Sequence, residues 1–367
     1  MPLRGLLCGL IAAALAAGCG GGERTAAPRT AADLPRKLDP ELAKRAEELG
    51  VPGATAALFV RGELVWSGAW GKADIAAGRA MTAQTPVAYA SVGKMITAAL
   101  ALRLAEQGRL SLDDPVRKWV PEWPGKRSKT LRDLLGHDGG IEDAPESFYT
   151  AQIRRPARRF RPADWLAALR PPQPEDSSLY NNSGFVVAGL ALRRAAGDGW
   201  LDLLRDTAPG IALQPDQRVR GAPARGYVYP RGAGDPRPFG DDGQLVPSTS
   251  LATAAWTSGG YAGSVEAMAR WADGLFAGKL LEPESLDEMT DFRPSTALGD
   301  AYGLGLARFE VEGREAWGHL GGMPGFHTDL THVPEERLTL FAVWNDDLID
   351  QDRIPQTLMK VALDGIG

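Results

Sequence analysis

Two kinds of hydrophobic pattern divide the chain into three parts. The segment "ATAALFVRGELVWSGAWG" has apolar runs on both sides of Arg61 and Gly62, which predicts a β-hairpin. Helical patterns such as "TLRDLLGH", "PADWLAAL" and "GFVVAGLALRRAAG" dominate from residue 91 to about 206. From residue 303, strand patterns return in "GLGLARFEVEG", "GFHTDLTHVP" and "LTLFAVWND", before a closing helix near residues 354 to 363.

Boundary signals refine this pattern at two helices. In "LDPELAKRAEELG", Asp39 is expected to be the N-cap, Pro40 the first helical residue and Gly50 the stop, with an apolar face that carries Leu42, Ala46 and Leu49. Residues 215 to about 260 are rich in Gly and Pro and are expected to be irregular, after which Ser264 caps another helix.

Strands at both chain ends with helices between them predict an α+β fold, an α/β sandwich. We expect an antiparallel sheet flanked by helices, built from both chain ends, with an inserted all-helical domain. The predicted sheet domain comprises residues 38–90 and 256–367, and the mainly helical inserted domain comprises residues 91–255. A chain of 367 residues is long enough to bury a large core.

The N-terminus has the layout of a secretory signal: Arg4, a short apolar core, and then small residues. Its ending "LAAGC" is similar to a bacterial lipobox, so residues 1–19 are predicted to be a lipoprotein signal with Cys19 as the lipidated residue. Residues 20–37 are then expected to form a flexible tether. The predicted location is the bacterial cell envelope, with a lipid anchor as the only membrane contact. A plain secretory signal cut nearby is the alternative.

Charge and composition exclude several classes of protein. The net charge is −5 and no basic stripe appears, so nucleic acid is not an expected partner. No apolar run reaches the roughly 18 residues that a membrane-spanning helix needs. The four histidines have no ligand spacing, so no metal and no cofactor are expected. The sequence makes no prediction of oligomeric state.

The segment "ASVGKMITAALAL" carries one charged side chain, Lys94, three residues after Ser91. On a helix, these two side chains lie on one face about one turn apart. Apolar surroundings lower the pKa of a lysine and favour a neutral amine, and a helix start favours negative charge at the serine. For an isolated S-x-x-K pair, a capping serine with a lysine that reaches the surface is the more common arrangement, so this pair needs support from other motifs.

Further segments occur in an order that resolves this choice: "TLRDLLGHDGGI", "LYNNSGFVVAGLAL", "TSGGYAGSVEAMARWADGL" and "AWGHLGGMPGFHTDL". With them, nearly the whole chain after the N-terminal signal resembles the serine beta-lactamase and penicillin-binding (DD-peptidase) superfamily. The resemblance is to the class C-like branch, which also contains esterases and D-amino-acid peptidases.

The resemblance implies roles for two of the motifs. Ser91 matches the acylated serine and Lys94 the lysine that helps remove its proton. In "YNN", Tyr180 matches the tyrosine that transfers protons, and Asn182 the asparagine that holds Lys94 and the amide of the substrate. Because an ordinary tyrosine pKa is near ~10, Tyr180 needs either nearby cations that favour a phenolate or a concerted proton shuttle.

The third motif, "HLGG", stands where lactamases have K-T-G. The resemblance implies an oxyanion hole from the backbone N–H groups of Ser91 and Gly322, with Gly321 and His319 in the substrate site. His319 is mostly neutral at pH 7 and Leu320 has no hydroxyl, so a strong grip on a carboxylate is not expected.

The sequence thus predicts a serine acyl-hydrolase that forms an acyl-enzyme at Ser91. Its substrate is an ester, amide or peptide, including D-amino-acid cell-wall peptides, and beta-lactam hydrolysis is expected to be weak. The alternative is a lipoprotein of the same fold that does not turn over and serves as a penicillin or ligand receptor or as a wall-associated scaffold.

Overall fold

The computed structural model describes residues 33–126, 128–140, 142–170, 180–229, 235–240, 245–295, 298–347 and 353–366. The predicted signal and Cys19 lie outside these residues, as does most of the predicted tether. No helix in the described ranges is long and apolar enough to cross a membrane.

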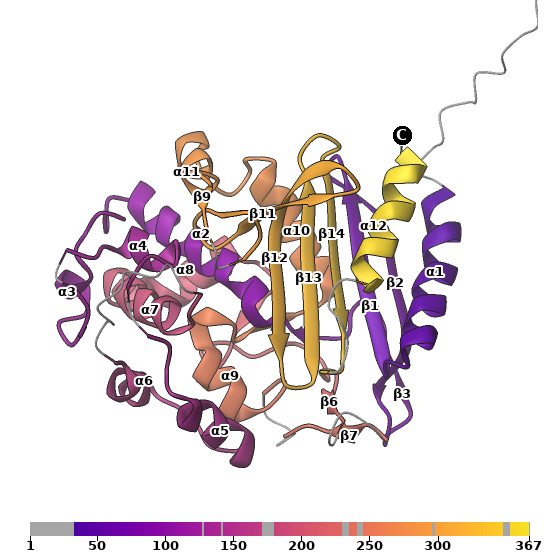
Figure 1. Ribbon diagram of the computed structural model, residues 1–367, viewed down its shortest axis with the longest axis horizontal. Helices are drawn as coiled ribbons and strands as arrows, with labels where there is room; N and C mark the ends of the chain where they lie inside the picture. Colours follow the sequence, from indigo (N-terminus) through magenta and orange to yellow (C-terminus); the bar gives the residue numbers. More distant parts are fainter. Residues whose placement is uncertain are drawn as a thin grey trace, which may run out of the picture.

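A nine-stranded antiparallel sheet built from both chain ends forms the centre of the molecule (Figure 1). Its order is β3-β2-β1-β14-β13-β12-β11-β10-β9, and β1 pairs with β14 where the two ends of the chain meet. This sheet confirms the predicted fold class. The strands are β1 (Gly53–Val60), β2 (Glu63–Asp74), β3 (Arg79–Ala80), β9 (Arg293–Pro294), β10 (Ala301–Tyr302), β11 (Ala307–Val311), β12 (Arg314–Met323), β13 (Phe326–Val333) and β14 (Leu338–Trp344).

The predicted hairpin is confirmed between β1 and β2. Arg61 and Gly62 connect the strands with φ of 53° and 91°, the left-handed conformation that a tight hairpin turn requires. β1 is buried along its whole length because helices cover both faces of the sheet at this point. Its continuous apolar run follows from that burial.

One face of the sheet is covered by α1 (Leu34–Leu49) and α12 (Arg353–Ile366), which lie side by side (Figure 1). The predicted start of α1 at Asp39 is wrong. The helix begins at Leu34, within the predicted tether, because Leu34 and Leu38 are buried against the sheet. Asp39 lies inside the helix and accepts a hydrogen bond from Trp66 Nε1 at 2.8 Å. Gly50 ends the helix with φ 69°, as predicted.

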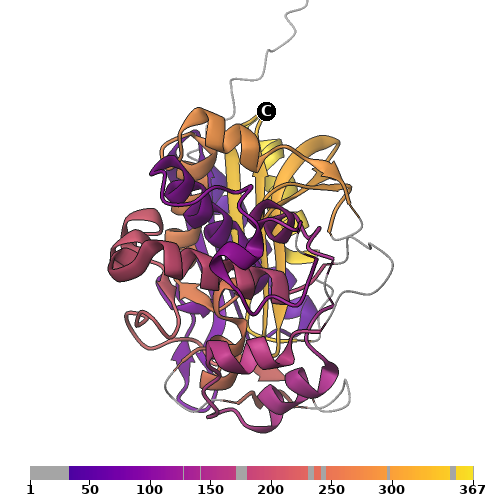
Figure 2. The same ribbon diagram turned by 90° about the vertical axis from the view of Figure 1, so that its left-hand side faces the viewer.

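The opposite face carries α10 (Val265–Phe276), and Ser264 caps this helix as predicted, accepting a hydrogen bond from the N–H of Ala267 at 3.2 Å. The helical part lies beyond it and faces the viewer in Figure 2, with the sheet behind. Its helices are α2 (Gly93–Glu106), α3 (Val116–Trp119), α4 (Leu131–Leu135), α5 (Glu146–Arg154), α6 (Pro162–Ala168), α7 (Ser183–Ala196), α8 (Trp200–Thr207), α9 (Thr249–Ala255) and α11 (Pro283–Met289).

The region predicted as irregular contains the helix α9, which the prediction lacked. Ser248 caps this helix, accepting a hydrogen bond from the N–H of Leu251 at 3.2 Å. Most of its residues are buried, so its sequence shows no alternation of apolar and polar positions. The same region contains the short pair β6 (Tyr227–Val228) and β7 (Arg237–Pro238).

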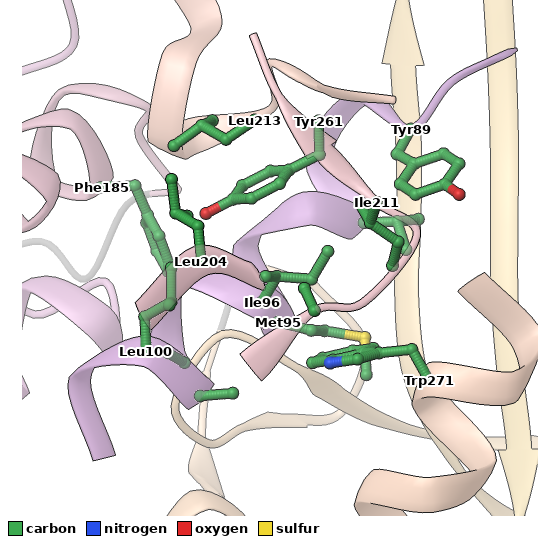
Figure 3. Close-up of a cluster of buried hydrophobic side chains, with 14 of the residues drawn as sticks. Tyr89, Met95, Ile96, Leu100, Phe185, Leu204, Ile211, Leu213, Tyr261 and Trp271 are labelled. Carbon is green, nitrogen blue, oxygen red and sulfur yellow. The ribbon is translucent and has the colours of Figure 1, made fainter. Parts of the chain in front are cut away.

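Helix α2 runs through the core between the sheet and the other helices. Met95, Ile96 and Leu100 point into a cluster that includes Phe185 of α7 and Tyr261 (Figure 3). Tyr261 belongs to a small sheet of β4 (Val87–Ala88), β8 (Tyr261–Gly263) and β5 (Ala212–Leu213). This packing fixes the N-terminal end of α2, where the candidate site lies, from several directions.

Candidate active site

Ser91 lies in a 3₁₀ turn, Ala90–Val92, that leads directly into α2. Ala90 holds a left-handed φ of 48°, which is unusual for a residue with a side chain. The turn is held in place by its neighbours: the N–H of Tyr89 donates to the carbonyl of Tyr261 at 2.9 Å. Ser91 is therefore presented on a constrained turn at the positive end of a buried helix.

Lys94 is completely buried, as predicted, and its Nζ makes three hydrogen bonds. Nζ lies 3.1 Å from Ser91 Oγ, 2.8 Å from Asn182 Oδ1 and 2.8 Å from the carbonyl oxygen of Ser258. The last two atoms only accept hydrogen bonds. A neutral amine that donates to both of them therefore keeps its lone pair for the hydroxyl proton of Ser91.

Burial lowers the pKa of Lys94 from 10.5 to about 7, while the charge of Asp143 acts in the opposite direction. A large fraction of the amine is therefore neutral near pH 7. A lysine whose ammonium group reached the solvent would keep its ordinary pKa. The arrangement supplies a base in contact with the serine hydroxyl.

Tyr180 is the third member of this group. Its hydroxyl hydrogen-bonds Ser91, and Lys94 Nζ lies 4.7 Å from the centre of its ring. Burial raises the pKa of Tyr180, and the bond to Ser91 only partly opposes this. Tyr180 therefore stays protonated at neutral pH. Of the two expected modes, this favours the concerted proton shuttle over a phenolate base.

Asn182 is held by a residue that the sequence analysis missed, Asp143. Asp143 Oδ1 accepts hydrogen bonds from the backbone N–H groups of Asn182 and Ser183, each at 3.1 Å, and from Ser183 Oγ at 2.9 Å. Its Oδ2 accepts from the Tyr149 hydroxyl at 2.6 Å. Asp143 lies 39 residues before Asn182 in a polar loop, so no local spacing links the two.

Strand β12 passes close to the Ser91 turn because Gly321 has no side chain. A Cβ atom there would lie 2.2 Å from Thr328 Oγ1 and 3.0 Å from the carbonyl oxygen of Tyr89. Thr328 Oγ1 itself donates to that carbonyl at 3.0 Å, which ties β13 to the turn. Gly322, the next residue of β12, lines the same cavity as Ser91. The two residues predicted to form the oxyanion hole therefore line one cavity.

His319 lies beneath this surface with 1% of its area exposed. Its Nε2 pairs with the Tyr302 hydroxyl at 2.9 Å, and its Nδ1 lies against the carbonyl oxygen of Leu320. Burial lowers the pKa of His319 to about 3, so the ring is neutral. The ring is 6.0 Å from that of Tyr180, centre to centre. The structure thus places His319 behind Tyr180, where its packing supports the site.

The cavity beside Ser91 has a volume of about 250 Å³. Its walls come from the Ser91 turn, α5, α6, α9 and the end of β12, and they are formed by Ala90, Ser91, Tyr149, Gln152, Trp165, Asn182, Leu251, Ala254, Ala255, Ser258, Gly259, Gly322, Met323 and Pro324. Within the described ranges, no group of three or more His, Cys, Asp and Glu side chains could hold a metal ion.

Comparison with known proteins agrees with this architecture. Esterase EstB from Burkholderia gladioli is 37% identical over 123 residues, which are 32% of this chain and 31% of the esterase. A D-aminopeptidase from Brucella anthropi is 24% identical over 327 residues, 85% of this chain and 59% of that protein. The chain thus spans less than two thirds of the length of these two relatives.

A solved structure shows the same fold. The D-amino acid amidase from Ochrobactrum anthropi SV3, complexed with D-phenylalanine, is similar with a TM-score of 0.77 and 23% identity, over 90% of this chain and 99% of the amidase. The family model described as beta-lactamase matches residues 38–361. Because this match covers most of the chain, the protein belongs to the beta-lactamase family.

Proposed function

We propose that this protein is a serine acyl-hydrolase that acts on an ester, amide or peptide through an acyl-enzyme at Ser91. The observation that carries the proposal is the contact of Ser91 with both Lys94 and Tyr180 at the wall of a cavity. Relatives named esterase and D-aminopeptidase support acyl transfer to water as the reaction type.

In the acylation step, Ser91 Oγ attacks the carbonyl carbon of the substrate while its proton moves to the neutral amine of Lys94. The backbone N–H groups of Ser91 and Gly322 stabilise the oxyanion that forms, and each such donor is typically worth ~10² to 10³ in rate. As the carbonyl re-forms, the Tyr180 hydroxyl passes its proton to the leaving group and takes up the proton held by Lys94, so that both side chains regain their starting protonation states. The leaving group departs protonated, and the acyl group stays on Ser91.

In the deacylation step, a water molecule attacks the acyl carbon, and its proton returns through Tyr180 and Lys94. The ester bond to Ser91 breaks, Ser91 regains its proton and the acid is released. Asn182 holds Lys94 Nζ in place during both steps through the 2.8 Å bond to Oδ1. Bases of this kind contribute about 10² to 10⁴ in rate.

Beta-lactam turnover is proposed to be weak. Lactamases of this superfamily carry a K-T-G motif where this chain has His319, Leu320 and Gly321. His319 is buried and uncharged, so it adds no cation for the beta-lactam carboxylate. A rate of nitrocefin hydrolysis equal to that of dedicated lactamases would contradict this part of the proposal.

The first test is covalent labelling of the soluble chain that starts near Arg24 with a fluorophosphonate, followed by intact-mass measurement. We expect one adduct on the parent and none on Ser91→Ala. Ser111→Ala, which changes an exposed serine, is the matched control and should label like the parent. A folded parent without an adduct would transfer support to the alternative of a receptor or scaffold without turnover.

We further propose that the protein is exported and lipid-anchored at Cys19, on the basis of the N-terminal pattern alone. The measurement is the mass of the N-terminal peptide from a bacterial membrane fraction. A diacylglyceryl-modified Cys19 is expected, and Cys19→Ala should release the protein from the membrane. A parent protein found only in the soluble fraction would contradict the anchor.

A further inference from the structure

The cavity beside Ser91 is uncharged on every wall that the described residues form. Leu251 and Ala254 from α9, Met323 from β12 and Trp165 from α6 give it an apolar surface. Lys94 is not itself a wall residue, but its Nζ contacts the wall residues Ser91, Asn182 and Ser258 and is positive when protonated. A substrate ammonium group in this space would lose its hydration, meet no counter-charge on these walls and lie close to that amine.

Asp143, the carboxylate bonded to two of the wall residues, has no capacity left for such a group. Its Oδ1 accepts bonds from the backbone N–H groups of Ala144, Asn182 and Ser183 and from Ser183 Oγ, and Oδ2 accepts from Tyr149. The Nδ2 of Asn182 lies a further 3.5 Å from Oδ2. A carboxylate has about four lone-pair positions, so these donors saturate it. Asp143 therefore holds the residues of the site in place and has no lone pair left to accept a hydrogen bond from the ammonium group of a substrate.

Two buried donors in the same walls favour a different kind of group. Trp165 is 2% exposed and Gln152 is 3% exposed, and neither Trp165 Nε1 nor Gln152 Nε2 has a hydrogen-bond partner among the residues that the structure describes. An indole N–H can only donate. Buried donors left without an acceptor are costly, so a ligand whose acceptor oxygen pairs with either nitrogen, once that side chain has rotated toward the cavity, gains free energy of binding.

We propose that the acyl part of the substrate is uncharged and carries a hydrogen-bond acceptor, as in an N-acylated amino acid or peptide, and that a free α-amino group is disfavoured. The proposal rests on the proposed Ser91 acyl-enzyme and names its substrate class. It separates this chain from an enzyme that removes residues from a free amino terminus, which must bind the ammonium group in its acyl site.

The test uses three ethyl esters that differ at one position: N-acetyl-D-phenylalanine, D-phenylalanine and 3-phenylpropanoic acid, together with the L-forms of the first two. Acid release at pH 7 gives kcat/KM for each. We expect the N-acetyl ester to exceed the phenylpropanoyl ester by about 10-fold, the effect of one or two hydrogen bonds, and the free amine to be the poorest. Equal or faster turnover of the free-amine ester would overturn the proposal.

Failure of the proposed function gives a different result from failure of this inference. If Ser91 forms no fluorophosphonate adduct and no ester is cleaved, the serine-hydrolase function is wrong. If Ser91 is labelled but the N-acetyl ester has no advantage over the other two, the function stands and the assignment of the acyl site is wrong. Each result therefore decides one of the two claims.

Variants locate the effect in the cavity wall. Trp165→Phe and Gln152→Met each remove a donor while keeping most of the side-chain volume, and each should reduce the ratio of N-acetyl to phenylpropanoyl turnover. Trp70→Phe, at a partly exposed indole on β2, is the control and should keep the parental ratio. Circular dichroism melting confirms that the variants are folded. An unchanged ratio in both cavity variants would contradict the role of these donors.

Discussion

Acylation of Ser91 should follow the titration of Lys94. The pKa of Lys94 is lowered to about 7 by burial, and only the neutral amine can take the serine proton. With that pKa, the neutral fraction is about 1% at pH 5, half at pH 7 and above about 90% at pH 8. The rate of acylation should therefore rise about 100-fold between pH 5 and a plateau above pH 8.

The substitution Asp143→Asn tests the origin of this titration. The charge of Asp143 raises the pKa of Lys94. Removal of this charge should therefore lower the pKa of Lys94 and move the rising, acidic limb of the plot of acylation rate against pH to lower pH. Asparagine keeps a side-chain oxygen that can accept from the N–H groups of Asn182 and Ser183. At pH 6 the acylation rate of Asp143→Asn, divided by the plateau rate of the same variant, should therefore be larger than the corresponding ratio for the parent.

The assay is the rate of fluorophosphonate labelling from pH 5 to 9, measured by intact mass. Asp138→Asn is the matched control, because Asp138 lies in the same loop, has a side chain that is 54% exposed and pairs with Lys129 at 3.3 Å. Its profile should coincide with that of the parent. Labelling that is independent of pH, or a limb that moves to higher pH in Asp143→Asn, would refute the reasoning.

Three more predictions concern β12 and the buried titratable groups. Gly321→Ala should lower kcat at least about 10-fold and destabilise the fold by about 1 to 3 kcal/mol, because its Cβ would lie 2.2 Å from Thr328 Oγ1. In Gly274→Ala, the nearest atom to the new Cβ would be Leu280 Cγ at 3.9 Å, an ordinary contact. This control should therefore keep the parental kcat in an ester turnover assay and should not lose stability in urea unfolding. Between pH 7 and 10, Lys94 is mostly neutral in the folded chain and protonated in the unfolded chain. The free energy of unfolding of the parent, minus that of Lys94→Met, should therefore rise by about 1.4 kcal/mol per pH unit over this range. A difference that is flat in pH would mean that Lys94 keeps its ordinary pKa. NMR signals of the His319 ring should stay constant from pH 5 to 8, because its pKa is about 3; a titration in that range would show the ring to be more accessible than its burial indicates.

The motif residues of the site could be predicted because each lies in a short, ordered pattern. Ser91 and Lys94 are one helical turn apart, and the apolar residues around Lys94 already indicate its burial. The β1–β2 hairpin was predictable from Arg61 and Gly62 for the same reason: the signal is local.

Features that depend on contacts distant in sequence were not predictable. Asp143 becomes part of the site only when α7 folds against its loop, and nothing in the sequence around it marks that contact. The N-cap was misplaced at Asp39 because burial of Leu34 and Leu38 extends α1 beyond the local signal. His319 matches a substrate-site motif by position, and only the fold shows that Tyr302 holds its ring below the surface.

The central claim is that Ser91 carries the acyl group during turnover. The most direct measurement is acid quenching of the protein during hydrolysis of N-acetyl-D-phenylalanine ethyl ester, followed by mass mapping of its peptides. The account predicts the N-acetylphenylalanyl group on Ser91 in the parent and no acylated peptide in Ser91→Ala, which should also lose turnover. Continued hydrolysis by Ser91→Ala, or an acyl group on a residue other than Ser91 in the parent, would contradict it.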